Sequence, residues 1–322
     1  MPTPGNPAGA LGGINLQVIA QDSLTTLLAQ FPLINKFTTD FGGDILQRGE
    51  SVTTRIASGV AATDIAAGGY TRSNVASTAK TVTLNKHKGF VMGFADGEVA
   101  RGGYDVLRRT FIRPAAHAVV KAVMDDVFRL CTAGNFASTG YNSTVAAFDA
   151  DAVADISQAL TDANVPMAGR TLIVRPALYT SLAKDNSIQA QYASGTNAPL
   201  TENLLPRIHG FEINQYTALP NGGTSGFGAV GSVGDADYYQ GLDANLKGIA
   251  VSPEAILIAA RLPATPTNWY GNVATATDSE SGLSIQVREW YDGDAGEQKL
   301  SMSILYGMSV GNAACLSKII AS

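Results

Sequence analysis

Charge is what this sequence lacks most. Only 15% of its 322 residues are Asp, Glu, Lys or Arg, against roughly 25% in an ordinary soluble domain. The net charge is −5 and no block of Lys and Arg occurs, which argues against a dedicated nucleic-acid-binding protein because neutralising phosphates requires such clusters. Charge is also depleted at the centres of subunit interfaces. The composition therefore fits a chain with much of its surface between subunits, and equally an Ala-rich globular protein.

Cysteine and long apolar runs are scarce as well. The two cysteines, Cys131 and Cys315, stand far apart in apolar surroundings, where small buried thiols in a reducing cytosol are expected. No run of about 18 apolar residues could span a bilayer, and residues 1–7 lack the basic region and apolar core of a signal peptide. We therefore expect a cytosolic chain that is neither secreted by that route nor embedded in a membrane.

Motifs for catalysis and ligand binding are also missing. The chain has three histidines, His87, His117 and His209, and no nucleophile-elbow sequence surrounds a Ser or Cys. His117 has no second His or Cys three or four residues away, as a zinc site would need. The glycine-rich run 222–228 lacks the Lys-Ser/Thr of a phosphate-binding loop. The sequence therefore predicts no catalytic residue, no cofactor and no metal.

The N-terminal part is predicted to be an arm followed by one helix. Residues 1–13 are mainly Pro, Gly, Ala and polar residues, too poor in large apolar side chains to pack without a partner surface. Apolar residues recur at roughly helical spacing over residues 14–28, and the helix ends before Pro32 because the residue preceding a proline avoids the helical region.

Residues 49–94 are predicted to form strands that flank a long stretch without regular periodicity. Ser51–Ile56 and Thr81–Lys88 alternate in polarity, whereas the stretch between them has no periodicity and little charge. A long loop without a local core is commonly functional or ordered by a neighbour. We interpret it as an extended two-stranded arm, which is marginal alone in water and gains order from another subunit. A surface insertion in a monomer is the alternative.

The longest helical pattern runs from Tyr104 to Thr132, about 40 Å at 1.5 Å per residue. Pro114 interrupts it, so either the helix bends there or Pro114 begins a second helix. Charged residues, Asp125 and Asp126 among them, are expected mostly off its apolar face. The expected apolar positions are Leu107, Phe111, Ala115, Ala118, Ala122, Val123 and Val127.

The remainder alternates helices and strands and ends in a hairpin, which makes an α+β body. Asp149 or Asp151 is placed to cap a helix that ends near Pro166 and Gly169, and Pro176 opens another helix. The first of these helices is expected to bury Val153, Ile156, Leu160 and Ala163. Strands are expected at 171–174, 211–216, 246–252, 283–290 and 300–310, with the last two half-buried or one-sided and joined by a turn at 291–296.

The order of these parts resembles the major capsid (coat) proteins of tailed bacteriophages, whose fold is shared with herpesvirus capsid subunits and encapsulins. The most specific local signs are residues 282–311, preceded by 255–263, and residues 170–182, which look like the strand, proline and helix that open the family's axial domain. The resemblance implies an α+β fold with these parts: 1–48, N-terminal arm and helix; 49–95, extended β-hairpin (E-loop) and a peripheral-domain strand; 96–147, spine helix of the peripheral domain; 148–280, axial domain; 281–322, C-terminal hairpin returning to the peripheral domain.

The resemblance also implies a function. It predicts a major capsid protein whose pentamers and hexamers close an icosahedral shell around a double-stranded DNA phage genome, without sequence-specific binding, and which assembles in the host cytoplasm and resides in the virion. Implied partners are copies of itself, a separate scaffolding protein, a portal protein and optional decoration proteins, but no membrane. Candidate intersubunit contacts on the hairpin are Arg55, Asp64, Tyr70, Arg72 and Lys80.

Two alternatives remain open at the level of sequence. An encapsulin-like compartment shell has the same fold and encloses protein cargo. A monomeric Gly/Ala-rich binding protein or hydrolase would instead have an ordered pocket, for which the glycine-rich loop 221–228 is the first place to look.

Overall fold

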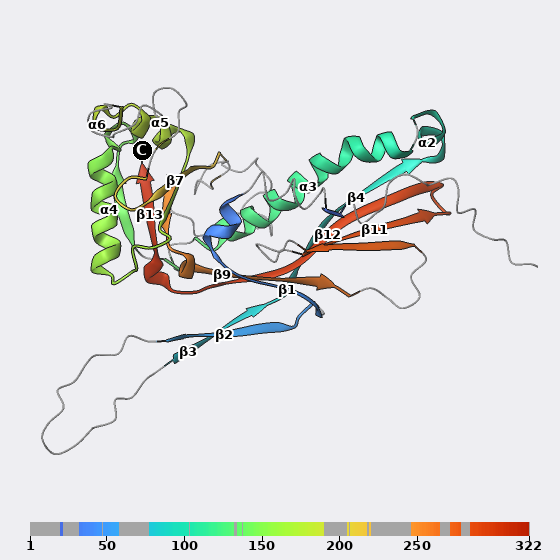
Figure 1. The fold of residues 1–322 in the computed structure, drawn as a ribbon, viewed down its shortest axis with the longest axis horizontal. Coiled ribbons are helices and arrows are strands. Elements are labelled where there is room, and N and C mark those ends of the chain that lie inside the picture. Colours follow the sequence, from blue (N-terminus) through green and yellow to red (C-terminus); the bar gives the residue numbers. More distant parts are fainter. Residues whose placement is uncertain are drawn as a thin grey trace, which may run out of the picture.

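Two β-sheets at opposite ends of an elongated molecule carry the fold (Figure 1). The computed structural model describes residues 20–21, 32–46, 48–57, 77–102, 104–131, 134–136, 138–189, 205, 207–217, 219, 246–264, 271–277 and 284–321. The predicted arm, most of the predicted helix 14–28 and the glycine-rich loop 221–228 lie outside these residues.

The first sheet has six described strands arranged around β12. The order is β1–β9–β12–β11–β10, with β4 also paired to β12, and β1 runs parallel to β9 while the other pairs are antiparallel. Helix α2 leads from β4 into α3, which lies along one face of this sheet (Figure 1). The elements are β1 (Thr38–Leu46), β4 (Lys86–Ala95), β9 (Ile256–Pro263), β10 (Asn272–Thr277), β11 (Ser284–Asp292), β12 (Glu297–Val310), α2 (Asp96–Gly102) and α3 (Tyr104–Arg129).

The second sheet has five described strands in the order β5–β13–β8–β6–β7. Helices α4, α5 and α6 belong to this unit, as the left side of Figure 1 shows. The elements are β5 (Thr139–Ser143), β6 (Thr171–Val174), β7 (Glu212–Gln215), β8 (Leu246–Val251), β13 (Leu316–Ala321), α4 (Ala150–Asp162), α5 (Pro176–Ala183) and α6 (Asn186–Gln189). Short 3-10 helices span Pro32–Lys36, Val145–Ala147, Pro253–Ala255 and Ala313–Cys315.

Two chain connections run side by side between the sheets. One leads from β8 to β9 and the other from β12 to β13, and backbone hydrogen bonds join them: Gly311 N–H donates to Ala255 O at 3.0 Å, and Asn312 N–H to Glu254 O at 2.8 Å. As a result the chain passes between the two sheets more than once. β9 and β10 lie in the six-stranded sheet, whereas β8 before them and β13 at the end of the chain's described part lie in the five-stranded one.

The α4 region matches most of the sequence prediction. The Asp149 side chain caps α4 by accepting a 2.9 Å hydrogen bond from the Ala152 N–H, and α5 begins at Pro176 as expected. Two details were wrong. Ala163 is exposed, and the helix ends at Asp162 rather than near Pro166, because Asn164 takes a left-handed backbone conformation, with a φ of 58°, that stops it.

The predicted C-terminal hairpin is confirmed as β11 and β12, but the description of β11 as half-buried was wrong. Its polar residues Ser284, Gln286 and Glu289 are buried together with its apolar ones. Gln286 keeps its amide satisfied by donating to Pro263 O at 3.1 Å. Ser284 and Gln286 thus line a buried, hydrogen-bonded face rather than a solvent face, whereas Glu289 lies on the same face as Ile285 and Val287.

Helix α3 runs through Pro114 as one helix to Arg129, three residues short of the predicted end. Its apolar stripe is rotated from the prediction: Ala118 is exposed, and Asp126, expected off the apolar face, is buried. The buried positions come in neighbouring pairs repeated every four residues, which makes a broad stripe suited to a flat sheet. They are Ala115, Ala116, Val119, Val120, Val123, Met124, Val127 and Phe128.

The Asp126 carboxylate joins α3 to the sheet. It is 1% exposed, lies 3.1 Å from Lys86 Nζ of β4 and 3.2 Å from Arg129 Nη1, and accepts a 2.6 Å hydrogen bond from the Tyr306 hydroxyl of β12. Burial and this hydrogen bond raise the pKa of Tyr306, so the phenol keeps its proton and remains a donor. Lys88 Nζ is 3.6 Å away. The buried charge is thus compensated from three elements.

We predict that Tyr306→Phe lowers the free energy of unfolding by about 1.5–3 kcal/mol, because a buried carboxylate loses a charge-assisted hydrogen bond. Tyr141→Phe is the control, since its hydroxyl donates to Thr144 O at 2.8 Å in an exposed position and its loss costs less than about 1 kcal/mol. Urea unfolding of both variants measures the difference. Equal losses would contradict a special role for the Asp126 hydrogen bond.

The neighbouring Asp125 makes the stability of the fold depend on pH. Burial raises the pKa of its carboxyl from 3.8 to about 6, although Lys121 and Arg129 oppose the rise. Because the folded state holds this proton more tightly than the unfolded chain does, the contribution of Asp125 to stability is full below pH 3.8 and is lost as the pH rises through about 6.

We predict that Asp125→Asn is more stable than the parent protein at pH 7.5 and that this advantage shrinks toward pH 4.5, because the amide mimics the protonated carboxyl. Asp155→Asn, at an exposed position of α4, removes the same charge and changes stability by less than about 0.5 kcal/mol. Urea unfolding across this pH range tests both variants. An advantage that does not depend on pH would mean that Asp125 is not protonated in the fold.

Candidate assembly surfaces

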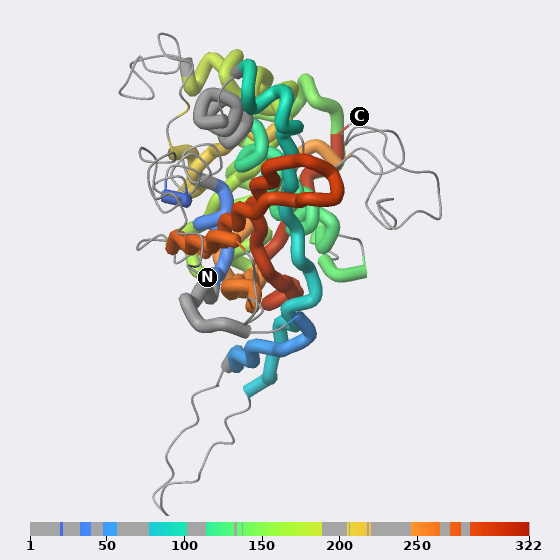
Figure 2. The backbone as a smooth tube through the Cα atoms, turned by 90° about the vertical axis from the view of Figure 1, so that its right-hand side faces the viewer, coloured from blue at the N-terminus to red at the C-terminus, as the bar shows by residue number. Residues whose placement is uncertain are grey.

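A two-stranded ribbon projects from the six-stranded sheet. β2 (Ser51–Ala57) and β3 (Ser77–Thr83) pair antiparallel over their whole length, and Figures 1 and 2 show the ribbon leaving the body. The prediction of an extended two-stranded arm is confirmed for these residues. The single strand expected over 81–88 was wrong, because the chain turns at Leu84, where the Asn85 N–H donates to Thr83 O at 2.9 Å. A new strand, β4, begins at Lys86.

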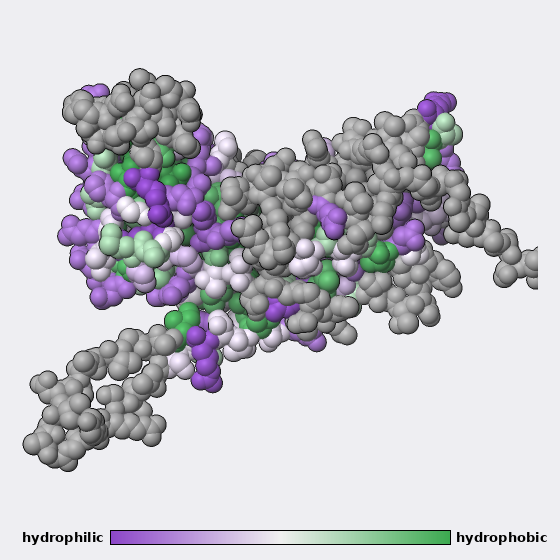
Figure 3. Space-filling view, in the orientation of Figure 1, coloured by the Kyte–Doolittle hydropathy of each residue, from purple (hydrophilic) through white to green (hydrophobic). Residues whose placement is uncertain are grey.

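In the part of the ribbon that the structure describes, the contacts with the body lie at its base. Val82 and Leu84 pack with Leu257, Ala259 and Leu305 in a small apolar cluster that is separate from the main core, with Val52 beside it. Farther out, cross-strand contacts are polar: Thr53 and Thr81 share a hydroxyl hydrogen bond of 3.3 Å, and Arg55 Nη1 donates to Ser77 Oγ at 3.2 Å. Apolar and hydrophilic side chains meet where the ribbon leaves the body (Figure 3).

At Gly307, the backbone of β12 passes directly against the backbone of the ribbon at Thr83. A Cβ atom built at this position would overlap the carbonyl of Thr83, so the two backbones approach more closely than any side chain permits. Sequence reasoning missed this residue. The available signal was a glycine inside an otherwise regular strand, which often marks the close approach of another backbone.

The candidate contact residues Arg55 and Lys80 lie on opposite faces of the ribbon. Thr54 is the partner of Lys80, whereas Arg55 is opposite Ala79, and successive residues of a strand point to opposite faces. Lys80 therefore shares the half-buried face of Val52 and Val82, and Arg55 lies on the exposed one. The structure does not bring these two residues together. Asp64, Tyr70 and Arg72 lie outside the described residues.

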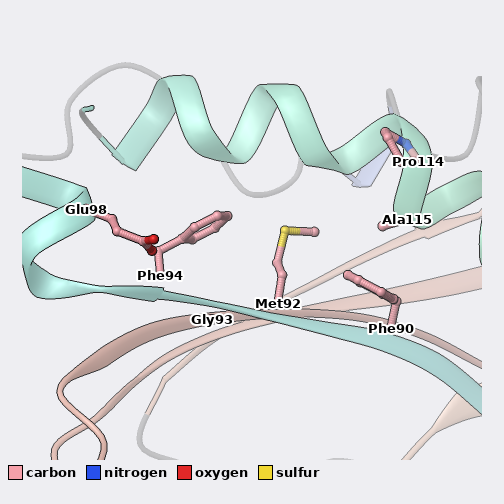
Figure 4. Close-up of a pocket in the computed structure, with 7 residues that line it drawn as sticks. All are labelled: Phe90, Met92, Gly93, Phe94, Glu98, Pro114 and Ala115. Atoms are coloured by element: carbon pink, nitrogen blue, oxygen red, sulfur yellow. The ribbon is translucent and has the colours of Figure 1, made fainter. Parts of the chain in front are cut away.

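An apolar pocket of about 490 Å³ lies between β4 and α3 (Figure 4). Phe90, Met92 and Phe94 point into it from alternate positions of β4, and Pro114 and Ala115 close it from the helix. Phe90 is 42% exposed. Glu98, the titratable residue among the described lining, uses one carboxylate oxygen to accept from the Ala95 N–H at 3.3 Å. This arrangement can hold apolar groups but offers no acid–base pair.

A second, more polar pocket of about 580 Å³ lies at the start of α4. Its two carboxylates are used structurally: Asp149 caps α4, and Asp185 accepts from Ala150 N–H at 2.9 Å and from the Ser187 hydroxyl at 2.8 Å. Burial alone would raise the pKa of Asp185, but these hydrogen bonds and that of the Ser187 N–H outweigh it and hold the pKa below its ordinary value. Both carboxylates are therefore engaged in hydrogen bonds that hold the local fold.

The expectation for the two cysteines can be checked directly. Cys131 and Cys315 are free and buried, as predicted, and burial raises the pKa of their thiols to about 12 and about 11. Among the described residues, His, Cys, Asp and Glu form no group that could hold a metal ion. Within the same part of the chain, no helix combines the length and apolar character needed to cross a membrane.

Comparison with solved structures identifies the fold. The capsid structure of cyanophage P-SCSP1u superposes with a TM-score of 0.62 and 15% identity, covering 89% of this chain and 86% of that one. The mature capsid of bacteriophage PhiM1 gives 0.54 and 12%, covering 89% and 88%, and a structure from Mycobacterium phage Che8 gives 0.52 and 17%, covering 83% and 84%. The fold is the α+β major capsid fold of tailed phages.

Sequence comparison supplies the family. No curated protein is significantly similar to the chain. A family model described as "Phage capsid protein" matches residues 77–319, well over half of the sequence, and favours a phage capsid over the encapsulin-like alternative. The chain therefore belongs to the phage capsid protein family and is a major capsid protein, a subunit of the virion shell.

Proposed function

We propose that copies of this chain form pentamers and hexamers that close an icosahedral shell around double-stranded DNA. In this proposal the shell is assembled in the host cytoplasm with a separate scaffolding protein and a portal protein, decoration proteins are optional, and the subunit itself has no catalytic role. The six-stranded sheet with α3 corresponds to the peripheral domain, the five-stranded sheet with its helices to the axial domain, and the ribbon β2–β3 to the E-loop.

The observation that carries the proposal is the ribbon's lack of a core. Among the residues of β2 and β3 whose side chains are described, Val82 alone is buried, and it belongs to the base cluster. A two-stranded ribbon with so little burial is marginal in water. We propose that it gains order by lying over a neighbouring subunit, with Arg55, Asp64, Tyr70, Arg72 and Lys80 among the contacts, so that folding of the ribbon and assembly of the shell are coupled.

Shortening the ribbon tests this coupling. We predict that replacing residues 59–74 with an Asn-Gly turn abolishes closed shells in negative-stain electron microscopy, because the outer ribbon no longer reaches the neighbour. Far-UV circular dichroism and the urea midpoint of the subunit should stay close to those of the parent protein, since the base cluster is intact. Normal shells from this variant would show that the ribbon has no intersubunit role.

The close contact between Gly307 and Thr83, which sets the angle at which the ribbon leaves the body, can be tested by substitution. We predict that Gly307→Ala lowers the free energy of unfolding by about 1–3 kcal/mol, because the added methyl group must push the Thr83 carbonyl aside, and that it yields fewer or misshapen shells. Gly293→Ala is the matched control, since a Cβ atom there would meet nothing within 4 Å. Urea unfolding and electron microscopy are the measurements. Identical behaviour of the two variants would contradict the close contact.

A further inference from the structure

The most exposed large apolar side chain among the described residues is that of Met167, at 60%. It lies in the turn 163–169, which joins α4 to β6. A second turn, 207–211, leads into β7 and lies beside the first, because a Cβ atom built at Gly210 would be 3.7 Å from Met167 Cε. Single exposed apolar residues are common on protein surfaces, so the significance of Met167 depends on how it is held. We call the turn 163–169 the knob.

A buried guanidinium fixes the knob to α4. Arg170 is 0% exposed. It donates to Pro166 O at 3.0 Å and to Val165 O at 2.6 Å, both within the knob. It also donates to Ser157 O of α4 at 3.0 Å. The Ser157 hydroxyl donates to His209 O at 3.1 Å, which ties the second turn to the same helix. Met167 is therefore presented from a rigid support.

Backbone strain is concentrated in the same two turns. In the part of the chain that the structure describes, the non-glycine residues with positive φ are Asn164, at 58°, and His209, at 47°. Gly169 and Gly210 also have positive φ, at 76° and 86°. Such conformations cost free energy in non-glycine residues and are frequent where a surface has a functional task. A strained, rigidly held turn with an exposed apolar side chain is suited to contact another surface.

The pocket of about 580 Å³ lies at the opposite end of α4. The knob follows the last turn of this helix, whereas the pocket includes Asp149, which caps its first turn. The helix has 13 residues and is about 20 Å long, so a subunit cannot place its own knob in its own pocket. Methionine is flexible and fills irregular apolar spaces well. The apolar lining of the pocket comprises Val145, Ala146, Phe148 and Ala177.

The positions of knob and pocket fit a ring of copies. A ring generated by rotation needs two different surfaces on each subunit, one of which meets the other on the next copy. Helix α4 begins beside α5 and α6, where Ala150 N–H donates to Asp185 at 2.9 Å, and it ends at the lower end of the unit in Figure 1. The ribbon projects toward the same lower side. The knob and the ribbon would thus meet the same neighbour.

The charges around the two surfaces are compatible with contact. Asp162 and Arg207 are exposed beside the knob, and the pocket lining includes Asp149, Asp185 and Lys184. Both surfaces therefore carry charges of both signs, and neither presents a block of like charge to the other. Charges at the rim of an apolar contact mainly set its specificity and register, so the methionine supplies the anchor.

We propose that Met167 of one copy inserts into the pocket at the start of α4 in the next copy, and that this contact joins the five-stranded units within the rings of the shell. The inference rests on the proposed function, that copies form pentamers and hexamers, and it names two surfaces that meet in them. Each subunit has one knob and one such pocket, so a closed ring engages every knob and every pocket.

Substitution of Met167 tests the contact. We expect Met167→Glu to lower the yield of rings and closed shells in negative-stain electron microscopy at least roughly tenfold, because a charge would be buried among apolar groups. Met167→Leu keeps an apolar side chain of similar volume and should assemble like the parent protein. The urea midpoints of the unassembled subunits should agree, since the side chain is exposed. Normal shells from Met167→Glu would overturn the proposal.

Disulfide cross-linking identifies the surface that the knob meets. Shells of the double variant Met167→Cys/Ala177→Cys are oxidised with copper phenanthroline and run on a non-reducing gel. A disulfide requires Cα atoms within about 4.4–6.8 Å, so we expect a ladder that ends at covalent pentamers and hexamers. Mixed shells of the two single variants are the control and should give dimers only, because Cys131 and Cys315 are buried and each chain then has one accessible thiol.

The outcomes separate this inference from the proposed function. Shells of the double variant that give no cross-linked ladder would show that the knob meets a different surface, and the proposal would be wrong although the shell exists. Absence of rings and shells from the parent protein, with and without its scaffolding protein, would instead refute the proposed function itself.

Discussion

Burial of β12 on both faces is the constraint on which the rest of this subunit depends. Strand β12 pairs with its hairpin partner β11 and with the earlier strands β4 and β9, so all of them are aligned on one template. Its alternate residues face two different surroundings, α3 on one side and the ribbon base on the other. A one-residue slip of register would exchange these two sets of side chains. The pairing of β12 therefore fixes where the ribbon and the spine helix stand relative to each other.

The two attachments made by β12 differ in strength and suit different tasks. On the α3 side, a broad apolar stripe is supplemented by the buried carboxylate of Asp126 and its donor Tyr306. Removing one partner of such a buried, compensated charge lowers the free energy of unfolding strongly. The α3 side of the sheet is therefore a rigid scaffold. On the ribbon side, a few apolar residues and the contact at Gly307 suffice. The ribbon's base therefore has a fixed direction, and the intersubunit role proposed for the ribbon concerns the residues beyond this base.

Several elements could be predicted from sequence because their cause is local. Asp149 caps α4, Pro176 opens α5, Thr171–Val174 is a wholly buried strand, and the Asp-Gly turn at 292–293 joins β11 to β12. Each depends on a few adjacent residues. The order of such elements was also enough to indicate the capsid family. The arrangement of the candidate contact residues was harder to predict. Arg55 and Lys80 lie on opposite faces of the ribbon, and this follows from the pairing register of β2 and β3, which the two strand patterns taken separately do not specify.

The types of many elements, their order and the absence of a recognisable catalytic motif could be derived from local sequence, because capping, alternation and turn chemistry act over a few residues. Tertiary structure alone decided which sheet each strand joins, that Asp126 is buried while Ala118 is exposed, and that Gly307 lies beneath Thr83. These features depend on contacts between segments that are not neighbours in the chain, such as β4 with β12 and Thr83 with Gly307. No local pattern records such pairing, since an apolar strand is equally suited to either sheet until its neighbours are in place.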